Sequence, residues 1–472
     1  MLPKISKISQ QKENCSAAVI IDKPGQISSP SFSEREKKYA AKKLKDKNEC
    51  TVFKLPHIFF FHQTKKEDGN SQAESARKAG AAFYDILKNE NIKTVQLARF
   101  SEKNLTLPFL EGLLLAGYSF SKYKKKKEER VLKEILVADD AVSAEQIDEL
   151  KTITEAAFHA RNLINEPLSY LTAERFSEEI AKLGKEAGFQ VEILNRKKIE
   201  ALRMGGLLAV NKGSIDPPTF NILEWKPQNA KNKQPVILVG KGVVYDTGGL
   251  SLKPTAKSMD YMKSDMGGGA VVAATLYAVA KNNLPVHVIG LIPATDNRPD
   301  GNAYVPGDVV TMYDGTTVEI KNTDAEGRLL LTDALSYAKK FNPKLVIDVA
   351  TLTGSAELIT GPHALLAMGN SPENLKRLQL SGEETFERVV ELPLWEEFAK
   401  PLKSSIADLN NLGAREGQTS IAGKFLEHFT GYPWLHLDTA GVAYLHEKIA
   451  YRPEGGNDFG TRLLCHFLKK FN

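Results

Sequence analysis

Cysteine is scarce in this chain, and no two cysteines stand at the spacing of a metal or redox site. The three cysteines, Cys15, Cys50 and Cys465, are far apart, which excludes a disulfide framework and suits a reducing cytosol. Cys465 lies in an apolar stretch, so we expect it to be a packed thiol rather than a nucleophile. We therefore predict a cytoplasmic protein.

Long apolar runs are absent as well. No stretch reaches the roughly 18 apolar residues that a membrane span requires, and the polar N-terminus lacks the apolar core of a secretory signal. The sequence therefore predicts neither a membrane segment nor a membrane partner.

Several hydrolase signatures are also missing. The chain has no GxSxG and no HExxH, which argues against a serine α/β-hydrolase and a zincin. Residues 246–248 (DTG) imitate the catalytic triplet of aspartic proteases, but those enzymes need two aspartates, and the nearest second copy, residues 438–440, lacks the glycine. None of the nine histidines is paired at ligand spacing, and we predict that His287 and His436 are structural.

The net charge of +5 over 472 residues indicates no particular partner. The one concentrated basic run, residues 122–127, allows either a nucleic-acid patch or a solvated turn between a helix and a strand. We favour the turn and expect no nucleic acid as a main partner, but accessory nucleic-acid binding stays open as an alternative.

The alternation of strand and helix signals predicts an α/β fold, and the length predicts two domains. We expect a smaller N-terminal α/β domain at 1–140, a connecting helix within 141–170 and a larger C-terminal domain at 171–472. In the first domain we predict strands at 17–21, 52–61, 94–97 and 134–138 and helices at 75–89 and 108–116. Residues 1–50 otherwise show no recognisable pattern.

Continuous apolar runs mark the strands of the C-terminal domain. They are residues 190–194, 220–225, 236–240, 286–291 and 345–350. Unbroken apolar runs are typical of strands that are buried on both faces. The sequence therefore predicts a mixed, mostly parallel sheet flanked by helices.

Three polar segments, 241–253, 322–328 and 351–354, stand directly after predicted strands. Open α/β sheets bind ligands outside the carboxyl ends of their strands, so the three segments are expected to converge on one pocket. Asp265 lies between the first two, just before the glycines 267–269. Those glycines lack the Walker pattern and need no phosphate.

The second segment spaces Asp324, Glu326 and Arg328 by two residues, which places their side chains on one face if the segment is extended. Together with Asp246 and Asp265, the pocket would hold four carboxylates, which repel one another unless cations lie between them. Such a cluster suits two divalent ions, which acidify a bound water and polarise a carbonyl. Arg328 at the start of a helical pattern suits an anion. The residues alone thus predict a metal hydrolase, and another two-metal hydrolase such as a phosphoesterase stays open.

Residues 322–329, NTDAEGRL, resemble the signature octapeptide of the leucyl (cytosol) aminopeptidase family. Residues 239–254, 262–268, 350–354 and 437–443 are similar to its other conserved stretches, and the resemblance covers about 155–472. It implies a metal-dependent exopeptidase that acts on peptide substrates, prefers leucine-like N-terminal residues and assembles as a homohexamer.

The resemblance also implies a role for each site residue. One Mn²⁺ or Zn²⁺ ion would be held by Asp246, Asp324 and Glu326, and the other by a neutral Lys241 with Asp246, Asp265 and Glu326, beside which the substrate amine would bind. Lys253 would polarise the scissile carbonyl as the electrophile and stabilise the gem-diolate, and Arg328 would hold a bicarbonate as general base. The residues implied for binding the substrate's first side chain are Met262, Thr351, Leu352, Gly354, Ala440 and Ala443.

Overall fold

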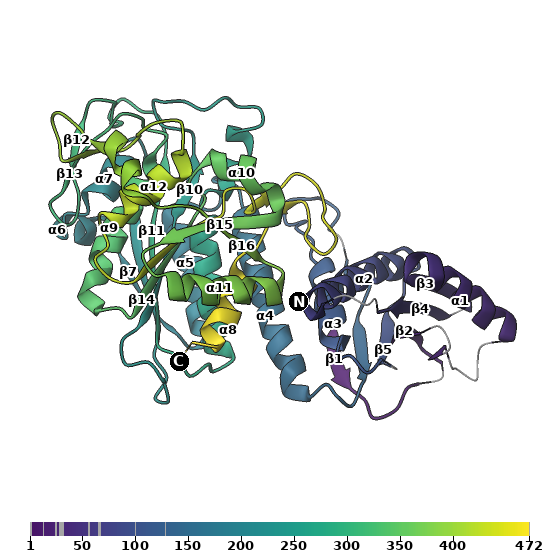
Figure 1. Ribbon diagram of the computed structural model, residues 1–472. Coiled ribbons are helices and arrows are strands. Elements are labelled where there is room, and N and C mark those ends of the chain that lie inside the picture. The colour runs from purple at the N-terminus through teal and green to yellow at the C-terminus, as the bar shows by residue number, and fades with distance from the viewer. Residues whose placement is uncertain are drawn as a thin grey trace. The chain divides into compact units, whose positions relative to one another are not determined.

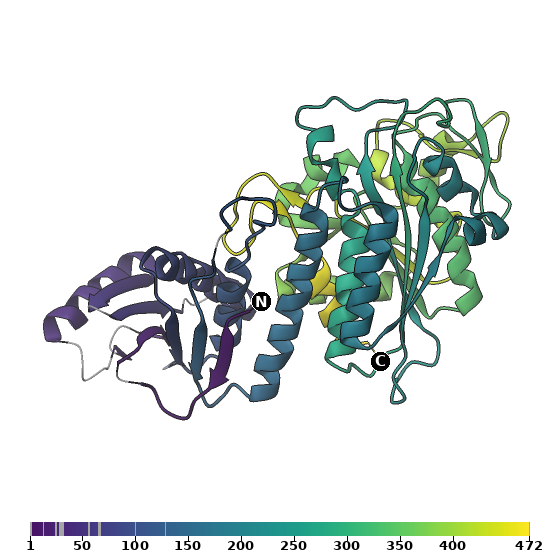
Figure 2. The same ribbon diagram turned by 180° about the vertical axis from the view of Figure 1, so that it is seen from behind.

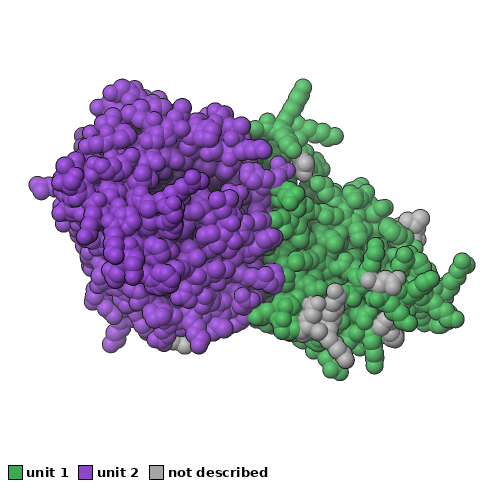
Figure 3. Space-filling view, turned by 45° about the horizontal axis from the view of Figure 1, so that its top comes forward, with its two compact units in different colours: residues 1–155, 447–453 green, residues 156–446, 454–472 purple. Residues whose placement is uncertain are grey.

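The computed structural model describes residues 2–12, 14–23, 26–27, 33–54, 57–64, 68–99, 101–127 and 129–471. The chain forms two compact units (Figure 3): residues 1–155 with 447–453 make unit 1, and residues 156–446 with 454–472 make unit 2. The boundary between them falls within the long helix α4 (Ala144–Asn165). In the described part of the chain, no helix is both long and apolar enough to span a lipid bilayer.

Unit 1 is built on a six-stranded sheet of order β1-β6-β5-β2-β4-β3. Its strands are β1 (Lys4–Lys7), β2 (Ser16–Ile21), β3 (Glu49–Lys54), β4 (His57–Gln63), β5 (Thr94–Arg99) and β6 (Glu134–Ala138). Its helices are α1 (Glu34–Lys47), α2 (Gly69–Asn89) and α3 (Thr106–Ala116). All neighbouring strands run parallel except β3 and β4.

Two expectations for unit 1 need correction. The single strand predicted at 52–61 is wrong, because β3 and β4 are antiparallel, with Phe53 opposite Ile58; β3 ends at Lys54 and β4 begins at His57, so the apolar residues on the two sides belong to different strands. Beyond the predicted strand at 17–21, which is β2, the first 50 residues also supply β1 and α1. Helix α1 begins with a capping box between Ser33 and Glu36. The basic residues 122–127 lie exposed in the segment between α3 and β6, as predicted for a solvated turn.

Unit 2 contains a nine-stranded mixed sheet, which confirms the predicted fold class. The order is β16-β15-β18-β14-β9-β11-β8-β7, with β10 also paired to β11. The strands are β7 (Gln190–Leu194), β8 (Thr219–Trp225), β9 (Val236–Gly240), β10 (Gly242–Asp246), β11 (Val288–Asn297), β14 (Leu345–Ala350), β15 (Ala364–Gly369), β16 (Arg388–Glu391) and β18 (Trp434–Asp438). The central strands β18, β14, β9 and β11 are parallel.

Helices cover both faces of this sheet (Figures 1 and 2), and each face has its own apolar core. One core receives α5 (Ala173–Ala187), α8 (Gly267–Lys281), α11 (Pro372–Thr385), α13 (Thr461–Lys469) and the last turns of α4. The other receives α6 (Arg196–Ala201), α7 (Gly205–Asn211), α9 (Glu326–Ala338) and α12 (Gln418–Glu427). Along β9, Val236 and Leu238 enter the first core and Ile237 and Val239 the second, which explains the unbroken apolar run.

Shorter elements complete unit 2. They are the 3₁₀ helix η2 (Met259–Ser264), α10 (Gly354–Thr360), the small sheet of β12 (Val309–Thr311), β13 (Thr317–Glu319) and β17 (Leu409–Asn410), and the pair β19 (Tyr444–Leu445) and β20 (Gly455–Gly456). In Figure 1, β10, α10 and α12 gather at the upper end of the main sheet.

Candidate active site

The carboxyl ends of strands in the main sheet bring the first and third polar segments to one cavity, and the second segment, which follows β13 of the small sheet, also lines it. Lys241 directly follows β9, Asp246 ends β10 and Thr351 directly follows β14. All three line a cavity of about 540 Å³ in unit 2. This is the edge at which open α/β sheets bind ligands.

Three buried carboxylates meet at the base of this cavity. Asp246, Asp265 and Glu326 each place one oxygen within 4.8 Å of the others. Asp324 also lines the cavity but is not part of this closest group. The predicted extended stretch through residues 324–328 is wrong beyond Ala325, because α9 begins at Glu326. The start of a helix, rather than strand alternation, therefore points Glu326 and Arg328 into the cavity.

Two lysines lie among the carboxylates. Lys241 Nζ is 2.7 Å from Asp265 Oδ2 and 2.9 Å from Glu326 Oε1, and it donates to the Thr351 carbonyl at 2.8 Å. Lys253 Nζ is 2.9 Å from Asp246 Oδ2 and forms an ion pair with Asp324. Four carboxylates thus face two ammonium groups, which leaves an excess of negative charge.

The excess charge is reflected in the pKa values. Burial alone would lower the pKa of Lys241 and of Lys253, but the neighbouring carboxylates outweigh burial and raise both. Burial raises the pKa of Asp246 and Asp265, and it raises the pKa of Asp324 to about 7 with the help of Asp246. A group of acidic oxygens held in this way is favourable for divalent cations.

The donor set fits such ions on a further observation. Oδ2 of Asp265, Oδ1 of Asp324 and Oε1 of Glu326 are buried; each forms an ion pair with Lys241 or Lys253, but none accepts a hydrogen bond of good geometry from the described residues. Buried carboxylate oxygens normally have hydrogen-bond partners. Metal coordination would satisfy these three oxygens.

Arg328 offers a separate anion site in the same cavity. Its side chain is 3% exposed, and its guanidinium carbon lies 5.7 Å from the centre of the Phe425 ring. Nε and Nη1 donate no hydrogen bond within the described part of the chain. Burial lowers the pKa of Arg328 to about 10 against the opposing effect of Glu326 and Asp438, so the group stays charged at neutral pH. Unpaired N–H donors on a buried cation suit an oxyanion.

Glycine at position 327 leaves room for Lys241. A Cβ atom there would lie 2.5 Å from Lys241 Cε, far inside normal contact distance. Gly268 has a related role, since its Cβ would lie 1.9 Å from the Val349 carbonyl oxygen where α8 meets β14. The glycines of residues 267–269 thus permit close packing.

Sequence reasoning missed two supporting residues. Asn297 donates from Nδ2 to Asp246 Oδ1 at 2.8 Å and to the Thr323 carbonyl at 2.9 Å. Asp438 accepts from the backbone of Leu352 at 3.2 Å and of Thr353 at 3.1 Å, and from the Thr353 hydroxyl at 2.7 Å. Both residues end strands of the same sheet, and their position at the end of an apolar strand could have identified them from the sequence.

Most of the residues expected to bind the first side chain line the cavity: Met262, Thr351, Leu352, Gly354 and Ala440. Ala443 is not among the lining residues; it is buried, next to the α-carbon of Gly267. The sequence did not single out the charged pair Glu357 and Arg415, which also line the cavity.

The other candidate residues are structural. His436 is fully buried in β18, with Nδ1 2.6 Å from Asp348 Oδ1, and His287 Nε2 lies 2.8 Å from Glu224 Oε1. The three cysteines are buried and form no disulfide, so Cys465 is a packed thiol, as expected.

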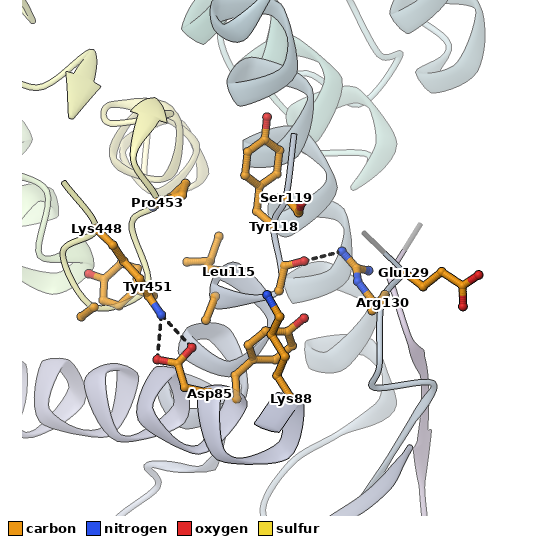
Figure 4. A pocket seen from close by; sticks show the side chains of 14 residues that line it. Asp85, Lys88, Leu115, Tyr118, Ser119, Glu129, Arg130, Lys448, Tyr451 and Pro453 are labelled. Atoms are coloured by element: carbon orange, nitrogen blue, oxygen red, sulfur yellow. Dashed lines mark hydrogen bonds and ion pairs between the residues drawn. The ribbon is translucent and has the colours of Figure 1, made fainter. Parts of the chain in front are cut away.

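A second cavity, of about 340 Å³, is lined by residues of unit 1 alone (Figure 4). Lys448 Nζ lies 2.7 Å from both carboxylate oxygens of Asp85, and Arg130 donates to the Gly117 carbonyl at 2.9 Å. Asp85, Lys448 and Arg130 are thus engaged with one another or with the backbone. Across the described residues, the only group of acidic, histidine or cysteine side chains at metal-binding separation is the one in unit 2.

Comparison with known proteins agrees with this site. The family model described as "Cytosol aminopeptidase family, catalytic domain" matches residues 158–465. A probable cytosol aminopeptidase of Chlorobium phaeobacteroides is 44% identical over 378 residues, covering 77% of this chain and 75% of that protein. One from Chlorobaculum tepidum is 44% identical over 383 residues, covering 78% and 75%.

Solved structures show the same similarity. The bottromycin maturation enzyme BotP, solved in complex with Mn, aligns with a TM-score of 0.85 and 31% identity over 96% of this chain and 99% of its own. A tomato leucine aminopeptidase mutant shares the fold, with a TM-score of 0.88 and 23% identity over 99% and 97% of the two chains. The predicted resemblance is thereby confirmed, and the chain belongs to the cytosol aminopeptidase family, a family of metal-dependent aminopeptidases.

Proposed function

We propose that this protein is a two-metal aminopeptidase that releases leucine-like N-terminal residues from peptides. The observation that carries the proposal is the meeting of Asp246, Asp265 and Glu326 within 4.8 Å of one another beside Lys241. Two bound divalent ions, Mn²⁺ or Zn²⁺, would supply an acidified water and a polarised carbonyl.

The ligand sets follow from the family resemblance. Asp246, Asp324 and Glu326 would hold one ion, and Lys241, Asp246, Asp265 and Glu326 the other. Lys241 must lose its proton to act as a ligand, and two dications in place of that proton favour the neutral amine. A free substrate amine beside Lys241 and Asp265 explains exopeptidase action, because a blocked N-terminus cannot bind there.

The remaining side chains stabilise charge. Lys253, held by Asp246 and Asp324, would donate to the scissile carbonyl oxygen, where negative charge develops during attack. Arg328 would hold a bicarbonate through its guanidinium group, and the bicarbonate would supply a general base. Met262, Gly354 and Ala440 offer an apolar or open wall for a leucine-like side chain. A homohexamer stays a prediction from the resemblance, and a cytoplasmic location stays a prediction from the cysteine usage.

The test is hydrolysis of leucine amide by protein that has been stripped with a chelator and reloaded with Mn²⁺ or Zn²⁺. We expect activity only after reloading, and none toward N-acetyl-leucine amide, the matched substrate without a free amine. An inactive metal-loaded protein, or cleavage of the acetylated substrate, would contradict the proposal.

One alternative retains a specific observation in its favour. The exposed basic residues 122–127 are compatible with accessory nucleic-acid binding. A mobility-shift assay over a salt series decides this point, because binding through phosphates weakens steeply with salt. Phosphate release measured beside peptide cleavage tests the other two-metal hydrolases.

A further inference from the structure

The catalytic cavity contains a cation that the proposed chemistry does not use. Arg415 lies in the loop between β17 and α12 and lines the same cavity as Lys253 and Arg328. Its side chain is exposed, and it forms no hydrogen bond or ion pair with the described residues. The two lysines, by contrast, are held by carboxylates, and Arg328 is buried.

The segment that carries Arg415 is anchored to the catalytic loop. Thr419 of α12 shares hydrogen bonds with the hydroxyls of Thr353 at 2.9 Å and Ser355 at 2.7 Å. Farther along the same helix, the Phe425 ring lies 5.7 Å from the Arg328 guanidinium carbon. Arg415 is therefore attached to a helix that borders the Arg328 and Thr353 part of the cavity.

The cavity also carries a group of the opposite charge. Glu357 of α10 is exposed and lines the cavity, and a Cβ on its neighbour Gly441 would lie 3.0 Å from the Glu357 Cα. Gly441 follows Ala440, one of the residues expected to bind the first side chain. Burial, and then the charge of Glu357, raise the pKa of the Tyr261 hydroxyl, which lines the same cavity. Glu357 therefore repels a substrate carboxylate, and Arg415 attracts one.

We propose that Arg415 binds the C-terminal carboxylate of the residue after the cleaved bond, which makes dipeptides the preferred substrates. The inference rests on the proposed aminopeptidase function. With the amine beside Lys241 and Asp265 and the first side chain against Met262, the second residue occupies the remainder of the cavity, which Arg415 lines. In a dipeptide that residue ends in a carboxylate, the group that a guanidinium binds in bidentate fashion. A longer peptide carries its carboxylate farther from the reacting bond.

The experiment compares the metal-loaded enzyme on Leu-Gly, Leu-Gly amide and Leu-Gly-Gly. The first two substrates differ only in the terminal charge. We expect kcat/KM for Leu-Gly to exceed the other two about tenfold, the factor of one charge-assisted hydrogen bond. In Arg415→Gln the ratio of acid to amide should fall to about one, and Arg415→Lys should retain part of it. Lys212→Gln, which removes an exposed positive charge outside the cavity, should keep the wild-type ratio.

The outcomes separate the two proposals. If none of the three substrates is cleaved by the loaded enzyme, the proposed function fails. If Leu-Gly amide or Leu-Gly-Gly is cleaved as fast as Leu-Gly, or if Arg415→Gln keeps the dipeptide preference, the dipeptide inference alone is wrong. Faster cleavage of Leu-Asp amide than of Leu-Gly amide, without a dipeptide preference, would assign Arg415 to acidic side chains and overturn the inference.

Discussion

Replacing Gly327 with alanine should lower the enzyme's activity and leave its stability nearly unchanged. The new Cβ would lie 2.5 Å from Lys241 Cε, 2.7 Å from Nζ and 3.0 Å from Cδ. Carbon atoms in contact keep about 3.5–4.0 Å, so the end of the Lys241 side chain must move by about 1 Å. Its Nζ now lies 2.7–2.9 Å from Asp265, Glu326 and the Thr351 carbonyl, and such a move disturbs all three contacts.

The two expected effects have different sizes. A displacement of about 1 Å at a catalytic centre costs on the order of 100-fold in rate. Gly327 lies in the first turn of α9, where alanine favours the helix by up to roughly 0.5–1 kcal/mol, and the clash involves the flexible end of a side chain. We therefore expect kcat/KM on leucine amide to fall about 100-fold while the unfolding temperature stays close to that of the wild type.

The assay combines initial rates, thermal unfolding and metal content on the same preparations. Gly301→Ala is the control, because a Cβ at Gly301 meets no atom within 4 Å. This variant should change neither kcat/KM nor the unfolding temperature. If Gly327→Ala kept kcat/KM within about threefold of wild type, the claim that glycine there makes room for a critically placed Lys241 would be refuted. A large loss of stability would refute the claim that the clash is absorbed by the side chain.

Two further predictions concern other buried groups. Lys253→Met and Arg328→Met should each lower kcat by roughly 10²–10³ with little change in unfolding temperature. Only the Arg328 variant should lose any rate increase that added bicarbonate gives the wild type. If the Arg328 variant kept that increase, Arg328 would not be the residue that holds bicarbonate. Asp333 of α9 accepts hydrogen bonds from the backbone of Leu207 and Tyr313, and burial raises its pKa from 3.8 to about 7. Because the folded carboxyl binds its proton more tightly than the unfolded one, its contribution to stability is lost as pH rises from about 4 to about 7. Urea unfolding of the chelated protein at both ends of this range should show a smaller pH dependence in Asp333→Asn than in wild type, and equal dependence in both would contradict the prediction.

Much of the catalytic unit could be read from local sequence. The strands β9 and β14 follow from apolar runs that face helices on both sides, and the polar residues after them mark the carboxyl edge of the sheet. The strand predicted at 52–61 failed because apolar residues indicate burial but not the direction of the chain. Lys54, Pro56 and His57 interrupt the apolar residues where β3 ends and β4 begins, and the prediction did not use that signal.

The residues that support the site could not be identified as easily. Asn297 is 51 positions from the Asp246 that it holds, and Asp438 is 85 positions from the Thr353 that it binds. Neither residue stands out from its neighbours in the sequence. Their roles arise from the order of strands in the sheet, which brings β10 beside β11 and β14 beside β18.

By itself, the sequence determined the α/β class, the metal-binding acidic residues and the family, because these depend on apolar periodicity and on short segments whose residues act together. Only the tertiary structure decided that Glu326 enters the cavity from a helix, that Lys241 needs a neighbour without a side chain, and that Arg415 and Glu357 line the cavity. These features depend on distances between segments far apart in the chain, which are set by how the sheet and its helices pack rather than by any local pattern.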